Sequence, residues 1–181
     1  MRYPRGRGGP GIRHLIDRRG FLGISIVAAL APRALARAAA PGAALASALE
    51  RSPFVYVSPL RSDGSESRCH AEVWFAWLDG AVVLNTAAAG WKARALAAGL
   101  ERARVWVGDH SPWKGALGTS EGFRAAPSFD ARGAIARDAD LSGRLVAEFE
   151  RKYPAEFGRW RDRMREGVLD GSRVLIRYTP L

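Results

Sequence analysis

The residues best suited to chemistry in this chain lie at one strand-to-helix junction, between residues 85 and 94. Thr86 ends an apolar, β-branched run, and Lys92 and Arg94 fall in the first turn of a segment, 91–100, with apolar residues at helical spacing. Cations are unfavourable at a helix N-terminus, where the amide groups and the helix dipole are already positive. They become favourable when an anion binds there. The pattern therefore suggests a phosphate site, and the alternative is that both cations are solvated surface charges.

Three predicted strands precede this junction. Residues 54–60 are β-branched and aromatic and end at a turn over 62–64, which indicates a strand entering a hairpin. Residues 69–78 are apolar on both faces, so we expect a second strand in the centre of the sheet. The Asp-Gly pair at 79–80 is typical of a type I′ turn, and 81–87 return as a third strand. The three strands would form a meander.

The remainder of the chain predicts three more strands and two longer helices. The strands are expected at 104–108, 127–137 and 172–179, and the helices at 138–153, capped by Asp140 or Ser142, and at 155–166. Residues 41–52 predict a linker or a short helix. Gly133, inside the fifth strand, suggests a β-bulge. The fold class is therefore mainly β with α-helices (α+β).

Residues 53–137 resemble the flavin-binding split β-barrels related to pyridoxamine 5′-phosphate oxidase. The resemblance rests on a strand HAEVWFAW followed by DG, a strand ending in LNT, and the runs WKARAL and RVWVGD; the C-terminal RVLIRYTP resembles the closing strand. It implies a six-stranded antiparallel split barrel, with a short helix after the third strand and two C-terminal helices before the last strand.

In that family, a Thr at the end of the third strand and a Lys six residues later bind the FMN phosphate, and these positions are Thr86 and Lys92 here. The oxidases carry an Arg before that Lys and basic residues around the second strand, where this chain has Trp91, His70 and Phe75. We therefore expect no pyridoxamine phosphate oxidase activity. The cofactor-binding residues that the resemblance implies are His70, Glu72, Val73, Trp74, Phe75, Asn85, Thr86, Trp91, Lys92, Arg94 and Trp106.

The resemblance implies an FMN-dependent oxidoreductase that acts on an unidentified small substrate, as a homodimer with the cofactor at the interface. The alternatives are a reductase that uses the deazaflavin F420, and a non-enzymatic protein that binds haem or flavin. If it binds haem, His70 or His110 would be the axial ligand. Arg177, near the end of the last strand, is either a substrate-anion ligand or a surface charge. Because flavin carries the hydride itself, no catalytic acid or nucleophile is required.

Other chemistries have weaker support. Asp109, His110 and Ser111 are the residue types of a hydrolase triad, but sequence neighbours cannot easily point at one another. A structural zinc site would need several ligands at standard spacing, which the chain lacks. The single cysteine, Cys69, excludes an internal disulfide, and we expect it to be a small buried residue.

Residues 1–40 predict an export signal, followed by the flavin-binding domain at 41–181. This segment has a basic start, an apolar run at 21–31 that is too short to span a bilayer, and small residues suited to cleavage. The pair Arg18-Arg19 ahead of a Phe-Leu resembles the twin-arginine motif, which implies the twin-arginine machinery as partner and a periplasmic or secreted product without a stable membrane span. A disordered basic arm and a retained anchor helix are the alternatives.

The net charge of +10 is concentrated in this leader. Residues 1–40 hold eight Arg and one Asp, a charge of +7, which leaves +3 for the other 141 residues. The globular part is therefore only mildly basic, and we expect no nucleic-acid partner.

Overall fold

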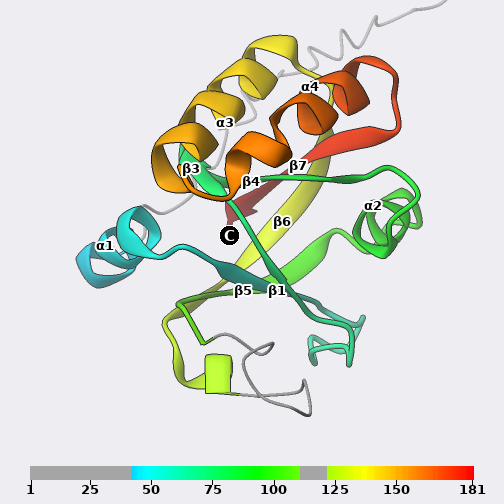
Figure 1. Cartoon of the computed structure of the whole chain (residues 1–181). Coiled ribbons are helices and arrows are strands. Elements are labelled where there is room, and N and C mark those ends of the chain that lie inside the picture. The colour runs from blue at the N-terminus through cyan, green and yellow to red at the C-terminus, as the bar shows by residue number, and fades with distance from the viewer. Residues whose placement is uncertain (1–41, 111–121) are drawn as a thin grey trace, which may run out of the picture. The chain divides into compact units, whose positions relative to one another are not determined.

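The computed structural model describes residues 42–110 and 122–181. The predicted export signal lies outside the described residues, as does most of the loop that follows His110. In the described ranges, the strands form one antiparallel sheet with the order β2-β1-β5-β6-β7-β4-β3 (Figure 1). The strands are β1 (Val55–Pro59), β2 (Ala71–Val73), β3 (Ala76–Leu78), β4 (Ala81–Ala87), β5 (Arg102–Val107), β6 (Ser128–Ala136) and β7 (Arg173–Pro180).

The segment expected to be a single central strand, 69–78, is broken into β2 and β3, which lie at opposite edges of the sheet. β2 pairs with β1, and β3 pairs with β4. Because one continuous segment forms both edges, the sheet must curl toward itself, as in a split barrel. The described sheet has seven strands, whereas six were predicted. The prediction that this segment is a central strand is wrong.

The break occurs at Phe75 because side chains from α3 (Ala139–Lys152) and its C-terminal end replace the neighbouring strand. The N–H group of Phe75 donates to the hydroxyl of Tyr153 (3.1 Å), and its carbonyl oxygen accepts from Nζ of Lys152 (3.3 Å). The Tyr153 hydroxyl also bonds to the carbonyl oxygen of Pro53 (2.6 Å). Since the backbone groups of Phe75 are satisfied in this way, its side chain can be buried without ladder bonds.

The helices match the predicted places but differ at their ends. Besides α3, the described α-helices are α1 (Ala43–Arg51), α2 (Trp91–Ala97) and α4 (Arg161–Leu169). Two short 3₁₀ turns are η2 (Gly122–Ala125) and η3 (Phe157–Arg159). The segment predicted as one helix at 155–166 therefore contains η3 and the first part of α4. None of the described helices is long and apolar enough to cross a membrane.

The α3 cap also differs from the prediction. The carboxylate of Asp138 accepts from the N–H group of Leu141 (3.0 Å), so Asp138 is the cap in place of Asp140 or Ser142. This residue satisfies one of the free amide groups of the first turn.

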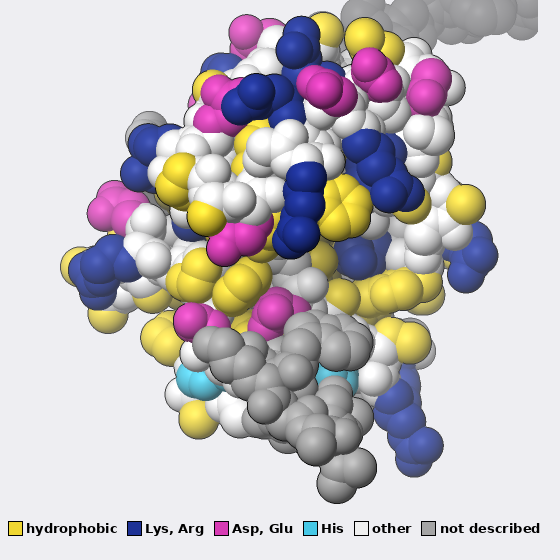
Figure 2. All heavy atoms as spheres, viewed as in Figure 1, with side chains coloured by type: hydrophobic (Ala, Val, Ile, Leu, Met, Phe, Trp, Pro, Cys, Tyr) yellow, Lys and Arg dark blue, Asp and Glu magenta, His cyan; other side chains and the backbone are white. Residues whose placement is uncertain are grey.

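Apolar side chains pack on both faces of the sheet. Along β7, Val174, Ile176 and Tyr178 belong to one core cluster, and the intervening Leu175 belongs to a second cluster shared with α3 and α4. In Figure 1 these two helices lie together over one face of the sheet. Acidic and basic side chains are interspersed over them on the face shown in Figure 2. Burial of alternate residues in two clusters explains why the strands are apolar on both sides.

Three smaller expectations have mixed outcomes. Asp79 and Gly80 both have positive φ (49° and 69°), as the type I′ turn requires. The pairing of β6 with β7 continues in register through Gly133, so the predicted bulge is wrong. Gly133 instead allows a close approach, since a Cβ there would lie 2.6 Å from Cε1 of Tyr178. Cys69 is exposed, whereas a buried residue was expected.

Candidate anion-binding site

The junction between β4 and α2 is held against the start of β7. The N–H group of Ala88 donates to the carbonyl oxygen of Ser172 (2.8 Å). A Cβ at Gly90 would lie 2.9 Å from the carbonyl oxygen of Ala87 and 3.6 Å from Oγ1 of Thr86. The turn therefore needs glycine, and it places the buried Thr86 hydroxyl beside the start of α2.

Lys92, in the first turn of α2, is a half-buried cation. Its ammonium group lies 4.8 Å from the centroid of the Trp91 ring, a cation–π contact. Burial lowers the pKa of Lys92 below its ordinary value, and the charge of Arg173 lowers that pKa further. Within residues 42–110 and 122–181, no ion pair joins Lys92 to a carboxylate.

Arg173, which the sequence did not identify, is the second cation of this site. Its guanidinium donates through Nε to the side-chain oxygen of Asn85 and through Nη2 to the Asn85 carbonyl oxygen (3.3 Å). A Cβ at Gly167 of α4 would lie 2.5 Å from Cγ of Arg173, so this glycine makes room for the arginine stem. Burial lowers the pKa of Arg173, and the nearby charge of Arg163 lowers it further.

Asn85 owes its position to two contacts. Besides accepting from Arg173, its side-chain amide donates to the carbonyl oxygen of Met164 in α4 (3.3 Å). Asn85 therefore fixes the guanidinium as a neutral partner, and it leaves the positive charge uncompensated.

Two half-buried cations that repel each other, with no carboxylate partner among the residues described, form an arrangement suited to an anion. Bringing like charges together costs free energy, and a bound dianion would reverse the sign of that interaction. Lys92 and Arg173 supply the charge, and the Thr86 hydroxyl supplies a further hydrogen-bonding group at the start of α2. Arg94 is exposed, and its part in this site stays a prediction.

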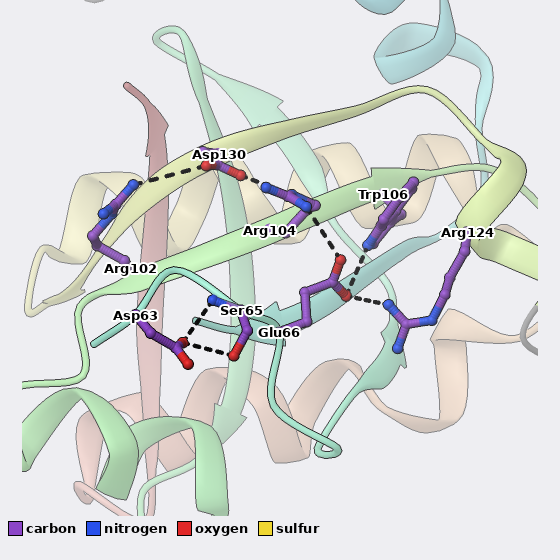
Figure 3. A network of polar contacts seen from close by, with 8 residues as sticks. All are labelled: Asp63, Ser65, Glu66, Arg102, Arg104, Trp106, Arg124 and Asp130. Carbon is purple, nitrogen blue, oxygen red and sulfur yellow. Dashed lines mark hydrogen bonds and ion pairs between the residues drawn. The ribbon is translucent and has the colours of Figure 1, made fainter. Parts of the chain in front are cut away.

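Trp106 lies in a different kind of environment, a network centred on Glu66 (Figure 3). The carboxylate of Glu66 accepts from Nε1 of Trp106 (3.3 Å) and from Nη1 of Arg104 (3.5 Å), and it also pairs with Arg124. Arg104 forms a second ion pair with Asp130 (2.8 Å) on the adjacent strand. Asp130 and Glu66 together raise the pKa of Arg104. Each arginine of this network has a carboxylate partner, which is typical of a structural role.

His70 and Glu72 lie close to an aromatic pair, Tyr56 and Phe123, whose rings stack at 4.7 Å. The Tyr56 hydroxyl donates to Oε2 of Glu72 (2.6 Å) and accepts from the N–H group of His110 (3.0 Å). The His70 ring lies 5.0 Å from the Phe123 ring, and its Nδ1 atom is buried with no hydrogen-bond partner in residues 42–110 and 122–181. Both described histidines therefore approach the same aromatic pair.

The other predicted cofactor residues of the second strand contribute to packing. Trp74 stacks on the Tyr153 ring at 4.7 Å, in the cluster beneath α3. Phe75 is fully buried, with Nζ of Lys152 3.5 Å from its ring centroid. Val73 packs against the other core cluster. A role for these side chains in binding a cofactor stays a prediction.

The described residues contain no group of three or more His, Cys, Asp or Glu side chains that could hold a metal ion. The chemistry of the β4–α2 junction is therefore that of cations, a hydroxyl and an amide. Such a set binds an anion through charge and hydrogen bonds.

The chain matches no protein-family model and no curated protein. Among solved structures it is similar to the conserved hypothetical protein Rv2991 from Mycobacterium tuberculosis, with 19% identity and a TM-score of 0.53 over 80% of this chain and 83% of that one. HutZ, the heme storage protein from Vibrio cholerae, is 12% identical, with a TM-score of 0.51 over 76% of this chain and 88% of that one. The flavocytochrome Anf3 from Azotobacter vinelandii is 12% identical, with a TM-score of 0.51 over 79% of this chain and 65% of that one.

The chain shares its fold with these proteins. At such low identity the similarity concerns the fold alone. It agrees with the mainly antiparallel, curled sheet with helices that the sequence resemblance implies, apart from the number of strands.

Proposed function

We propose that this chain is an FMN-dependent oxidoreductase of the split-barrel class, acting on a small substrate, and that it binds the flavin phosphate with Lys92, Arg173 and Thr86. The observation that carries the proposal is the pair Lys92 and Arg173: both are half-buried, the charge of Arg173 disfavours that of Lys92, and neither has a carboxylate partner among the described residues. A phosphate dianion is the ligand that such a pair favours most.

FMN also accounts for the lack of an obvious catalytic group at the junction. When bound, a flavin supplies the hydride chemistry itself, so the protein needs only to bind and orient it. The Trp91 ring beside Lys92 and the polar side chains of Asn85 and Thr86 are the groups here that could orient a ligand. The resemblance at Thr86 and Lys92 supports the same ligand.

The absorption spectrum of the purified protein tests the cofactor. Bound FMN gives two bands in the near-ultraviolet and blue with green fluorescence, whereas the deazaflavin F420, whose phosphate would suit the same cations, gives one shifted band. Apoprotein should take up added FMN. A colourless protein that binds neither FMN nor F420 would contradict the proposal.

Haem binding without turnover is a second candidate, favoured by the His70 Nδ1 atom, which is buried and has no partner in the part of the chain that the structure describes. The similarity to the fold of a heme storage protein is consistent with it. A sharp Soret band that persists in His110→Ala and disappears in His70→Ala would establish this function. Haem titration that gives no Soret band would exclude it.

Assembly as a homodimer, with the cofactor between the subunits, is part of the proposal. Hydrophobic side chains form a band below the helices on the face shown in Figure 2, which is the kind of surface a second subunit could cover. Light scattering after size exclusion should give twice the mass of one chain, and a monomer that binds FMN fully would contradict it.

Export by the twin-arginine route is a separate proposal and rests on Arg18 and Arg19. Their replacement by Lys should trap the precursor in the cytoplasm while folding and FMN binding stay intact. Fractionation of cells followed by immunoblotting measures this. Normal export of the double Lys variant would contradict the assignment.

A further inference from the structure

A cavity of about 600 Å³ lies among α3, α4 and the adjoining ends of β6 and β7. Its volume is within the range of about 300–1,000 Å³ that small-molecule sites occupy. The residues of the proposed phosphate site other than Arg173 do not line it. The cavity therefore shares Arg173 with the phosphate site, but its lining includes neither Lys92 nor Thr86.

Apolar side chains from three elements form much of its wall. Val146 comes from α3, Val168 and Leu169 come from α4, and Val174 comes from β7. Leu169 has 84% of its surface exposed, so the cavity includes a large apolar side chain that the described protein leaves in water. Such a surface gains free energy when an aliphatic group covers it.

The charges around the cavity are mainly positive. Arg137, Arg165 and Arg173 line it, and none of them forms an ion pair with a carboxylate in residues 42–110 and 122–181. Asp138 is the single acidic residue of the lining, and its carboxylate already caps α3 by accepting from Leu141. The unmatched positive charge selects an anion over a cation or a neutral molecule.

We propose that this cavity binds a small carboxylate with an aliphatic body, of the fatty-acid type. The aliphatic body contacts the wall formed by Val146, Val168 and Val174, and the carboxylate lies beside the exposed Arg137 and Arg165. This proposal goes beyond flavin binding and does not depend on it. The test therefore uses Arg137 and Arg165, which lie outside the phosphate site.

The probe is decanoate, titrated into the isotopically labelled full chain and followed by amide chemical shifts. Decanol and decyltrimethylammonium, which keep the chain length and change the charge, are the controls. We expect saturable shifts at Ser142, Gly143 and Val146, and an affinity for decanoate at least tenfold above that for either control. Equal affinity for all three, or shifts confined to other regions such as the leader, would overturn the proposal.

Gly143 offers a way to fill the cavity without disturbing the fold. It lines the cavity, and a Cβ there would meet no heavy atom within 4 Å. Gly143→Leu should weaken decanoate binding at least tenfold. Gly158, where a Cβ would also meet nothing within 4 Å and which lies outside the cavity, gives the control Gly158→Leu with no change. Unchanged binding by Gly143→Leu would overturn the proposal.

The charge requirement has its own variant. Arg137→Gln combined with Arg165→Gln should lower decanoate affinity about tenfold, change decanol affinity less than twofold and leave FMN affinity as it was. A double variant that binds decanoate as its parent does would overturn the assignment of the carboxylate. If Lys92→Met loses FMN binding and still binds decanoate normally, that result tests the flavin proposal and leaves the carboxylate proposal standing.

Discussion

Two regions of this molecule hold basic side chains in half-buried positions, and they differ in whether those side chains have carboxylate partners. Around Glu66, each arginine has a carboxylate: Arg104 pairs with Glu66 and Asp130, and Arg124 pairs with Glu66. At the start of α2, neither Lys92 nor Arg173 has a carboxylate partner among the described residues. Lys92 lies over the Trp91 ring and is repelled by Arg173, and Arg173 donates to the neutral Asn85 amide and is repelled by Arg163.

The difference separates charges that serve the fold from charges available to a ligand. A half-buried cation loses hydration, and a carboxylate partner compensates for that loss within the protein. Where the partner is missing, the cost stays until an external anion binds. The depressed pKa values of Lys92 and Arg173, beside the raised pKa of Arg104, express this contrast.

The largest expected effect on stability comes from Glu66→Gln, which removes the negative charge shared by two arginines. Because the Glu66 side chain is only 13% exposed, we expect a loss of about 2–3 kcal/mol in unfolding free energy, measured by urea denaturation. Glu148→Gln is the control, since its partner Arg151 is 66% exposed and that pair should contribute about 0–1 kcal/mol. FMN affinity should not change; a loss of FMN binding in Glu66→Gln would break the comparison.

Lys152 provides an intermediate case, a half-buried lysine that contacts the Phe75 ring and the Phe75 carbonyl oxygen. Burial lowers its pKa to about 8, below the ordinary 10.5. Between these values the unfolded chain binds more protons than the folded one, so unfolding free energy should rise with pH, by about 1–2 kcal/mol from pH 7.5 to 9.5.

Denaturation at several pH values measures that slope. Lys152→Gln should reduce it, and Lys92→Met, which leaves Lys152 in place, should retain most of it. A slope that is the same in Lys152→Gln and the parent would show that Lys152 stays charged through hydration, and the assignment of its low pKa would be wrong.

The smallest expected effect is that of Lys92→Met on the stability of the ligand-free protein. Methionine keeps the apolar stem and removes the charge that burial and Arg173 disfavour. Unfolding free energy should therefore stay within about 0.5 kcal/mol of the parent or rise slightly. A loss of 2 kcal/mol or more would place Lys92 with the structural cations of the Glu66 region.

Local patterns predicted the local features of this chain. The Asp79-Gly80 turn, the bounds of β4, the start of α2 and the Thr86 to Lys92 spacing all depend on residues that are close in sequence, whereas α2 ends at Ala97 and not at the predicted residue 100. The split-barrel class came from the same stretch through its resemblance to a family.

Features that depend on distant residues could not be predicted in this way. The break at Phe75 requires Tyr153, 78 positions away. Because the residues on both sides of the break are apolar, the sequence pattern predicts one continuous strand. Arg173 joins the anion site because β7 pairs with β4, which places it opposite Ala87. Several acidic or hydroxyl residues stand near the start of α3, and only the backbone conformation selects Asp138 as cap.

The affinities of FMN and riboflavin, measured side by side for the parent, Lys92→Met and Arg173→Gln, test the central claim most directly. Each variant removes a charge-assisted contact worth about 1.5–3 kcal/mol, so each should lose about 10- to 100-fold in FMN affinity and little in riboflavin affinity, because riboflavin has no phosphate. Arg177→Gln, on the same face of β7, is the matched control and should bind FMN normally. FMN affinities equal to the parent's in both Lys92→Met and Arg173→Gln would contradict the account.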